Sequence, residues 1–185
     1  MKQTDILRHL REYSIYKHRN STINHAFASA LSVADDFDLN NINKAIRILG
    51  QDPKKDLRCA YCDKPAQSWD HIKAIVFKGE FSGHGHQINN LIPCCKECNS
   101  SKGNRHWEVY LKIKNLNTKQ RINKIKRYIN FNALDTKNLL ESKAFKNDVE
   151  KFNEIKRQIF RLMKKGDRHA TAIRERLRGI KKKVK

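Results

Sequence analysis

The sequence predicts an α+β protein, a mainly α-helical chain with a small central module of short strands. Apolar residues recur at intervals of three and four in the first 53 residues and again after residue 110, which is the helical period. The segment between them lacks this period and contains all five cysteines of the chain. We therefore expect three regions, namely N-terminal helices in 1–53, a cysteine-bearing module in 54–110 and C-terminal helices in 111–185.

Three amphipathic helices are predicted in the N-terminal region. Their apolar positions are Ile6, Leu7, Leu10 and Tyr13, then Ile23, Phe27, Leu31 and Ala34, then Ile42, Ala45, Ile46 and Leu49. Gly50 follows the third helix, and Asp52-Pro53 comes shortly after it. Glycine suits the position past a helix terminus and proline cannot continue a helix, so the helical region is expected to end near residue 53.

The five cysteines stand close together in the central region, at positions 59, 62, 94, 95 and 98. An odd number in one segment argues against a disulfide framework and for a metal site in a reducing compartment. Cys59 and Cys62 have the spacing that lets two thiolates reach one ion, and Cys95 and Cys98 repeat it. We expect these four to hold a structural zinc ion. Cys94 is then a small buried side chain, or alternatively replaces Cys95 as a ligand.

The chain is strongly basic, with 40 Lys and Arg against 19 Asp and Glu and a formal net charge of +21. Residues 112–185 contain 24 Lys and Arg against 7 Asp and Glu, a net charge of +17. The helical pattern returns in this region, but its last stretch, Arg174 to Lys185, is expected to be frayed or disordered without a polyanion. Self-repulsion of this size favours nucleic acid as the partner.

Other sites of action are less compatible with the sequence. An anionic membrane would attract the same charge, but the chain has no apolar run near 18 residues and no basic amphipathic anchor with aromatic residues on one face. The N-terminus lacks the apolar stretch and the cleavage site of a signal peptide. We therefore expect no membrane association and a cytoplasmic location.

One constellation in the central module resembles a known family. Asp70-His71, Asn90-Leu91 and Cys95-x2-Cys98-Asn99 follow one another in this order. This combination resembles the HNH, or ββα-metal, endonuclease family in its zinc-supported four-cysteine form, and the layout is similar to small bacterial HNH proteins of restriction and defence systems. The resemblance covers about 50 of the 185 residues. It implies a ββα-metal fold for residues 54–110 and metal-dependent cleavage of DNA. Asn99 stands where the family name implies His.

The chemistry of phosphodiester hydrolysis assigns a role to each of these residues. His71 is the expected general base, because imidazole titrates near neutrality. Asp70, on the opposite side of the same strand, supplies a hard oxygen ligand for a catalytic Mg²⁺ or Mn²⁺. By the resemblance, Asn99 is the second ligand of this ion and Asn90 orients the base histidine.

Further basic residues surround this constellation. Lys102 and Arg105, on the helix after Asn99, are expected to contact phosphate oxygens. His84 and His86 stand in residues 73–87, which we expect to be a long loop. They could be additional metal ligands or DNA contacts, but a mobile polar loop is the interpretation that we favour.

The function expected from these features is a metal-dependent HNH endonuclease that cuts DNA in a restriction or anti-phage defence system, with the basic C-terminal helices gripping DNA. Cutting both strands usually needs two active sites, so a homodimer is a reasonable expectation. One alternative is a nuclease subunit that is active only with a partner protein in a larger defence complex. Another is a non-catalytic zinc module that binds nucleic acid, which does not need Asp70, His71 and Asn99 together. An RNA target also stays open, because both nucleic acids have charged backbones.

Overall fold

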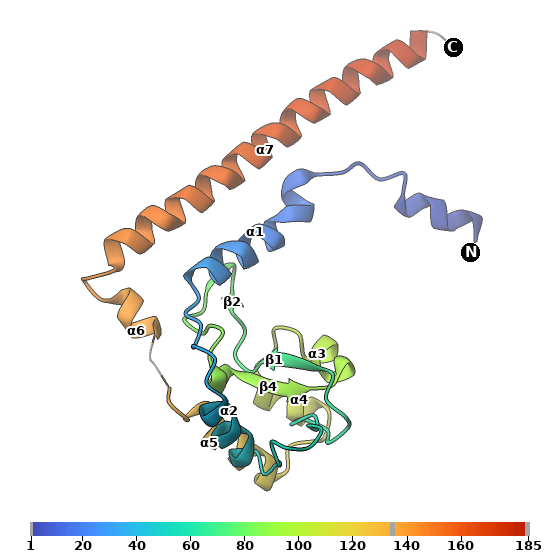
Figure 1. The fold of residues 1–185 in the computed structure, drawn as a ribbon. Helices are drawn as coiled ribbons and strands as arrows, with labels where there is room; N and C mark the ends of the chain where they lie inside the picture. Colours follow the sequence, from blue (N-terminus) through green and yellow to red (C-terminus); the bar gives the residue numbers. More distant parts are fainter. Residues whose placement is uncertain (1, 134–135, 184–185) are drawn as a thin grey trace. The chain divides into compact units, whose positions relative to one another are not determined.

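A computed structural model describes residues 2–133 and 136–183 of the chain (Figure 1). Within these residues, helices accompany two small antiparallel sheets, which confirms the predicted α+β class. None of the helices in this part of the chain has an apolar stretch long enough to cross a membrane. The elements are η1 (Gln3–Arg8), α1 (Ile15–Leu31), α2 (Leu39–Ile48), β1 (Ser68–His71), β2 (Val76–Phe77), β3 (Glu80–Phe81), η2 (Ile88–Asn90), β4 (Leu91–Cys94), α3 (Lys96–Lys102), α4 (Trp107–Ile113), α5 (Lys119–Ile129), α6 (Thr136–Glu141) and α7 (Lys146–Lys183).

The chain divides into two compact units, and each is described by itself. The larger unit is His25–Lys146, whereas the smaller unit joins the residues up to Asn24 to those from Asn147 onward. The region boundaries predicted at residues 53 and 110 both fall inside the larger unit. The reason is that α2 and α5, from the predicted terminal regions, pack onto the central module.

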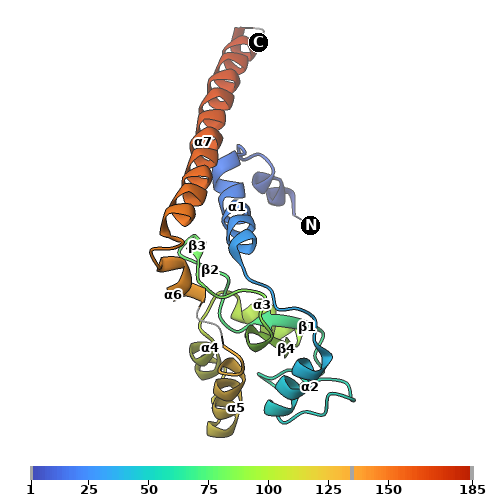
Figure 2. The same cartoon turned by 60° about the vertical axis from the view of Figure 1, so that its left-hand side comes forward.

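The core of the larger unit surrounds the antiparallel strands β1 and β4. Asp70 lies opposite Ile92 in this pair, and His71 lies opposite Leu91. Helices α2 and α5 contact one another beside it (Figure 2), and the Tyr128 hydroxyl of α5 donates to the carbonyl of Leu91. Burial of apolar surface is the main stabilising contribution here. The largest fully buried apolar side chains include Tyr61, Tyr128, Ile72, Ile92, Leu111 and Ile125.

The segment 73–87, which we expected to be a loop, contains the short hairpin β2–β3. Lys78 and Gly79 form its two-residue turn with φ angles of 51° and 83°, and positive φ at both positions is the signature of a type I′ turn. Val76 packs with Ala28 of α1 in a small apolar cluster. The hairpin was missed because strands of two residues are too short to display an alternating pattern.

In the smaller unit, one carboxylate fastens the start of α1 to α7. Asp167 of α7 accepts hydrogen bonds from the amides of Ile15 (2.6 Å) and Tyr16 (3.1 Å) and from the Ser14 hydroxyl (2.7 Å). The first amides of a helix have no acceptor within the helix, so this carboxylate satisfies donors that would otherwise need water. The rings of Tyr16 and Phe160 meet edge to face beside it.

Helix α7 continues to Lys183, the last described residue. The expectation of frayed chain from Arg174 to Lys185 was therefore wrong for residues 174–183, and residues 184 and 185 lie outside the described part. Glu12 pairs with Arg174 at 3.3 Å and also with Arg178. These contacts with the N-terminal segment reduce the repulsion that the sequence suggested for this stretch.

Replacement of Asp167 with alanine is expected to loosen the first turn of α1, because three donors lose their acceptor. Amide exchange at Ile15 and Tyr16 should accelerate on the order of tenfold, measured by hydrogen exchange. Asp148→Ala is the matched control, since Asp148 lies on the same helix and pairs with Lys151 at 3.6 Å. Equal exchange in the two variants would contradict the capping role.

The same contact should depend on pH. Partial desolvation raises the pKa of Asp167, but the bonds from Ser14, Tyr16 and Ile15 outweigh it and hold the pKa below its usual range. A lowered folded-state pKa means that the stabilisation is complete above the unfolded pKa of about 4 and is lost as the pH falls through the lower folded-state pKa. The protection of Ile15 should decrease over that acidic range and not between pH 6 and 8.

Candidate functional site

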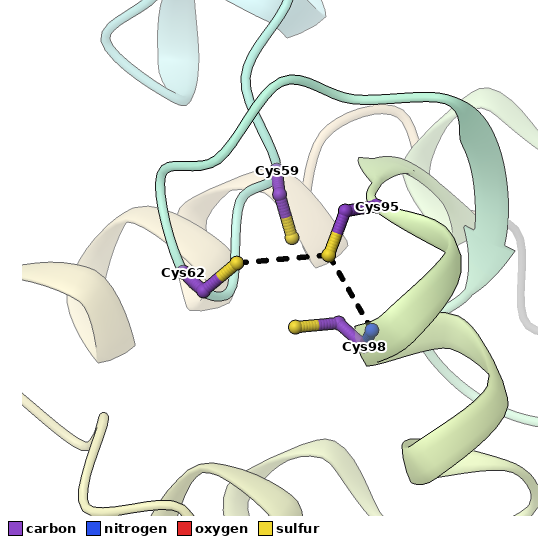
Figure 3. Close-up of side chains that lie close together, drawn as sticks. All are labelled: Cys59, Cys62, Cys95 and Cys98. Carbon is purple, nitrogen blue, oxygen red and sulfur yellow. Dashed lines mark hydrogen bonds between the residues drawn. The ribbon is translucent and has the colours of Figure 1, made fainter.

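Four cysteine side chains converge where the chain before β1 meets the first turn of α3 (Figure 3). The Sγ atoms of Cys59, Cys62, Cys95 and Cys98 all lie within 4.8 Å of one another, and those of Cys62 and Cys95 are 3.7 Å apart. A tetrahedral zinc ion with Zn–S bonds near 2.3 Å needs S···S separations of about 3.8 Å. Cys95 Sγ also accepts a hydrogen bond from the amide of Cys98 (3.4 Å). These residues fit one structural zinc ion.

Cys94 lies next to this cluster without completing it. Its Sγ is 3.9 Å from that of Cys59 and donates to the carbonyl of Cys95 at 3.3 Å. The hydrogen bond with Cys59 and burial raise the pKa of the Cys94 thiol. The geometry supports the ligand set with Cys95, and Cys94 has the buried position predicted for it.

The cluster controls how α3 meets β1. Helix α3 begins directly after Cys95 and packs on β1, where the Asn99 side-chain nitrogen donates to Ser68 Oγ at 3.2 Å. Ser68 and Asp70 are two residues apart in the strand, so they face the same side. The structure thus brings Asn99 and Asp70 to one face of β1, while His71 lies on the other.

The Asp70 carboxylate is buried and has two close partners. The Tyr61 hydroxyl donates to Oδ2 at 2.8 Å, and the Lys102 ammonium is 3.0 Å from the same oxygen. Lys102 also donates to the carbonyl of His71 at 2.8 Å. Burial raises the pKa of Asp70, whereas Lys102 and Tyr61 act in the opposite direction.

Lys102 therefore does not lie where the predicted phosphate contact needs it. Its side chain is 1% exposed, because its charge is matched inside the module by Asp70. Arg105 is exposed, and its guanidinium donates to the carbonyl of Ser101 at 2.7 Å near the end of α3. Of the two predicted phosphate contacts, Arg105 lies at the surface and Lys102 lies in the interior.

Asp70 and Asn99 are suitable ligands for a catalytic divalent ion, although Lys102 competes for Asp70. Asp70 and Asn99 offer a carboxylate and an amide oxygen from one side of β1, and these are the donors that Mg²⁺ and Mn²⁺ prefer. The Lys102 ammonium competes with such an ion at Oδ2 of Asp70, because both bind the same oxygen. Ion binding at Asp70 must therefore share or open this pair.

His71 lies against a second histidine. Its Nε2 is 3.1 Å from Nδ1 of His86, and the two rings meet edge to face. One imidazole can donate to the other here, so His86 restrains the orientation of His71. Burial, followed by the nearby His86 and Lys102, lowers the pKa of His71 to about 4. The imidazole is therefore neutral at pH 7, the state in which it can accept a proton.

The side chain of Asn90 bonds to the two ends of segment 73–87, whereas we expected it to orient His71. Its amide nitrogen donates to the carbonyls of Lys73 (3.1 Å) and Gly85 (3.0 Å), and its Oδ1 accepts from the amide of Lys73 (2.9 Å). These bonds join the two ends of segment 73–87. Because Gly85 precedes His86, the bonds position the loop that carries His86, and the predicted effect on His71 is indirect.

Sequence reasoning underestimated His86. We assigned it to a mobile loop together with His84, since neither residue has a spacing that distinguishes it as a partner of His71. The one available signal was its position four residues before Asn90. The fold supplies the missing information, because the bridge between Ala34 and His86 and the bonds of Asn90 fix this end of the loop.

A cleft of about 600 Å³ opens beside the candidate site. Phe77 and Phe81 of the β2–β3 hairpin line it, together with basic side chains that include Lys73, Lys78 and Arg105. Aromatic surfaces next to cations are suited to bases and phosphates of nucleic acid. The cleft borders Ile72, which directly follows His71 in the chain, and Asn104, which lies two residues after Lys102.

The strand pair β1–β4 is followed directly by α3 and is joined to it by a four-cysteine cluster that is compatible with structural zinc, so these elements form a ββα module. The model of the HNH endonuclease family matches residues 59–105, which contain all four cysteines and the candidate residues from Asp70 to Arg105. The chain thus carries an HNH module, as the resemblance predicted, and the match supports a nuclease of this family. Comparisons with curated proteins and with solved structures gave no match.

Removal of one zinc ligand is expected to abolish metal binding and to unfold the module. Cys95→Ser should lower the zinc content from about one ion per chain to near zero, because three thiolates hold zinc much more weakly. Cys94→Ser is the matched control and should retain the zinc. Metal analysis and thermal unfolding of both variants test this, and zinc loss in Cys94→Ser alone would reverse the ligand assignment.

Lys102→Met is expected to destabilise the module by about 3 kcal/mol, because the ammonium is lost while Asp70 stays buried and unpaired. The double variant Asp70→Asn with Lys102→Met should recover part of this loss, since both charges are removed. Urea unfolding measures both effects. Unchanged stability of Lys102→Met would instead favour the surface role that the sequence suggested.

Proposed function

We propose that the chain is a metal-dependent endonuclease that hydrolyses phosphodiester bonds of DNA. The observation that carries this proposal is the arrangement of three side chains inside the segment that matches the HNH family. Asp70 and Asn99 share one face of β1, and a neutral His71 stands on the other. A binding module needs none of these three residues, so their joint presence favours catalysis.

His71 acts as the general base in this proposal. Its imidazole takes a proton from the attacking water, which increases the nucleophilicity of the oxygen at neutral pH. His86 holds the ring from the side of Nε2, and the bond from Lys102 to the His71 carbonyl fixes the backbone. These contacts already restrict the orientation of the His71 ring, so less orientational freedom is lost when the transition state forms.

Asp70 and Asn99 hold the catalytic Mg²⁺ or Mn²⁺, which when bound neutralises charge that develops on the phosphate and on the leaving oxygen. Asp70 contributes the charged donor from β1, and Asn99 contributes a neutral donor from α3. When a metal ion shares the Asp70 carboxylate, Lys102 can still donate to the carbonyls of His71 and Gly103.

The substrate assignment rests on charge and on the cleft. A net charge of +21 favours a polyanion, and Arg105 and Lys73 lie at the cleft beside the site. Affinity for DNA should therefore decrease steeply with salt. RNA has the same backbone charge, so it is included as a competing substrate in the test below.

The biological setting is proposed on the likeness to small HNH proteins of restriction and anti-phage defence systems. None of the five cysteines forms a disulfide, which suits the reducing cytoplasm that we expect. Two alternatives retain the same site: a subunit that cuts only with a partner protein, and a zinc module that binds nucleic acid without cutting it.

Purified protein should convert supercoiled plasmid to nicked or linear DNA with Mg²⁺ or Mn²⁺, and excess chelator should stop the reaction. His71→Ala should lower the cleavage rate by about 100-fold or more, because positioned general bases contribute on that order. Gel electrophoresis of plasmid, and of an RNA of similar length, measures rate and preference. Faster cleavage of RNA would contradict the DNA assignment.

His25→Ala is the matched control, since His25 is an exposed histidine of the same unit and should leave the rate unchanged. Zinc content and DNA affinity of both variants should equal those of the native chain. If the native chain retains zinc and binds DNA without cutting it, the proposal fails in favour of the binding module or of a subunit that needs a partner.

A further inference from the structure

Helix α7 carries a stripe of exposed aliphatic side chains. Ile155, Leu162, Ile173, Leu177 and Ile180 have exposed fractions of 52%, 66%, 59%, 59% and 60%. We call these five residues the α7 seam. At 100° per residue they fall within an arc of about 60° around the helix axis. Side chains of this kind are ordinarily buried, and a continuous exposed row of them indicates an interaction surface.

The seam is separate from the basic surface of the helix. Between residues 155 and 180, every position inside the 60° arc is Ile, Leu or Gly. Besides the five seam residues, these positions are Ile159 and Gly166. The N-terminal segment contacts α7 mainly on another side, through Phe160, Asp167 and Arg178. Ile15 reaches Gly166 at the middle of the seam and adds an apolar methyl group there. Phosphate binding therefore does not explain the seam.

The spacing of the seam is symmetric. Ile155 and Ile180 are equally far from a midpoint between Asp167 and Arg168, and so are Leu162 and Ile173. Two copies of α7 that run antiparallel about a two-fold axis at this midpoint would place Ile155 against Ile180 and Leu162 against Ile173. This two-fold arrangement gives four of the five seam residues an aliphatic partner, and Leu177 then lies opposite Gln158 of the other copy.

One further feature favours the antiparallel arrangement over a parallel one. In an antiparallel pair Gly166 lies opposite His169 of the other copy, whereas a parallel pair in register sets Gly166 against Gly166, so that neither glycine gains a side-chain contact from the other copy.

The geometry points to a second copy of this chain as the occupant of the seam: we propose that the protein forms a homodimer through an antiparallel α7–α7 pair. Five half-exposed aliphatic side chains and the stems beside them bury roughly 500 Å² per copy, which totals about the 1,000 Å² that a specific interface needs. The proposal does not depend on nuclease activity. A dimer carries two HNH modules, one for each strand of a duplex.

Sedimentation of the full chain should give a mass twice 21.7 kDa at high micromolar concentration in moderate salt. Leu162→Glu alone and Ile173→Lys alone should each reduce the mass to that of one chain. Both substitutions in one chain should restore the dimer, because antiparallel pairing sets each new acid against a new base. A parallel pair would set like charges together and would stay dissociated.

Ala172→Glu is the matched control, since Ala172 is exposed on the same helix outside the seam, and it should remain dimeric. Helix content and zinc content should be unchanged in every variant. A native chain that stays monomeric, or a dimer that Leu162→Glu leaves intact, would overturn the proposal. Failure of the double variant to recover the dimer would overturn the antiparallel register.

Discussion

The four-cysteine cluster is the constraint on which the rest of the candidate site depends. Strands β1 and β4 have four residues each and α3 has seven, and elements of this length are unstable alone. A zinc ion held by four thiolates contributes binding energy on the order of 10 kcal/mol to folding. Such an ion would hold the first turn of α3 against the chain that leads into β1. The hydrogen bond between Asn99 and Ser68 joins the same two elements, so the cysteine cluster would position the candidate site without taking part in the proposed chemistry.

The second constraint is the buried group formed by Asp70, Lys102 and Tyr61. Such a pair contributes little net stability, yet removal of one member leaves a charge in the interior. The same carboxylate is the strongest donor for a divalent ion in the site. In the proposed function, stability and metal binding therefore depend on one group, because a metal ion at Asp70 would share or replace the Lys102 ammonium.

The two compact units carry different features of the chain. The larger unit contains the zinc-supported module, the histidine pair and the cleft. The smaller unit contains α7, on which basic residues and an aliphatic row occupy different sides. This separation allows one helix to meet a polyanion and a protein partner at the same time, because neither surface interrupts the other.

The sequence by itself determined the features that depend on local spacing. Two Cys-x2-Cys pairs predict a zinc site, the order of Asp70, His71 and Asn99 indicates an HNH module, and helical periods predict the class of the fold. Only the tertiary structure decided that Lys102 lies inside, that His86 reaches His71, that Asn90 holds a loop and that α7 stays helical to Lys183. The physical reason is that solvent exposure and side-chain partners depend on residues that are distant in the sequence. From the sequence, a lysine after Asn99 is expected to contact phosphate. Only the fold shows that Asp70 lies beside it.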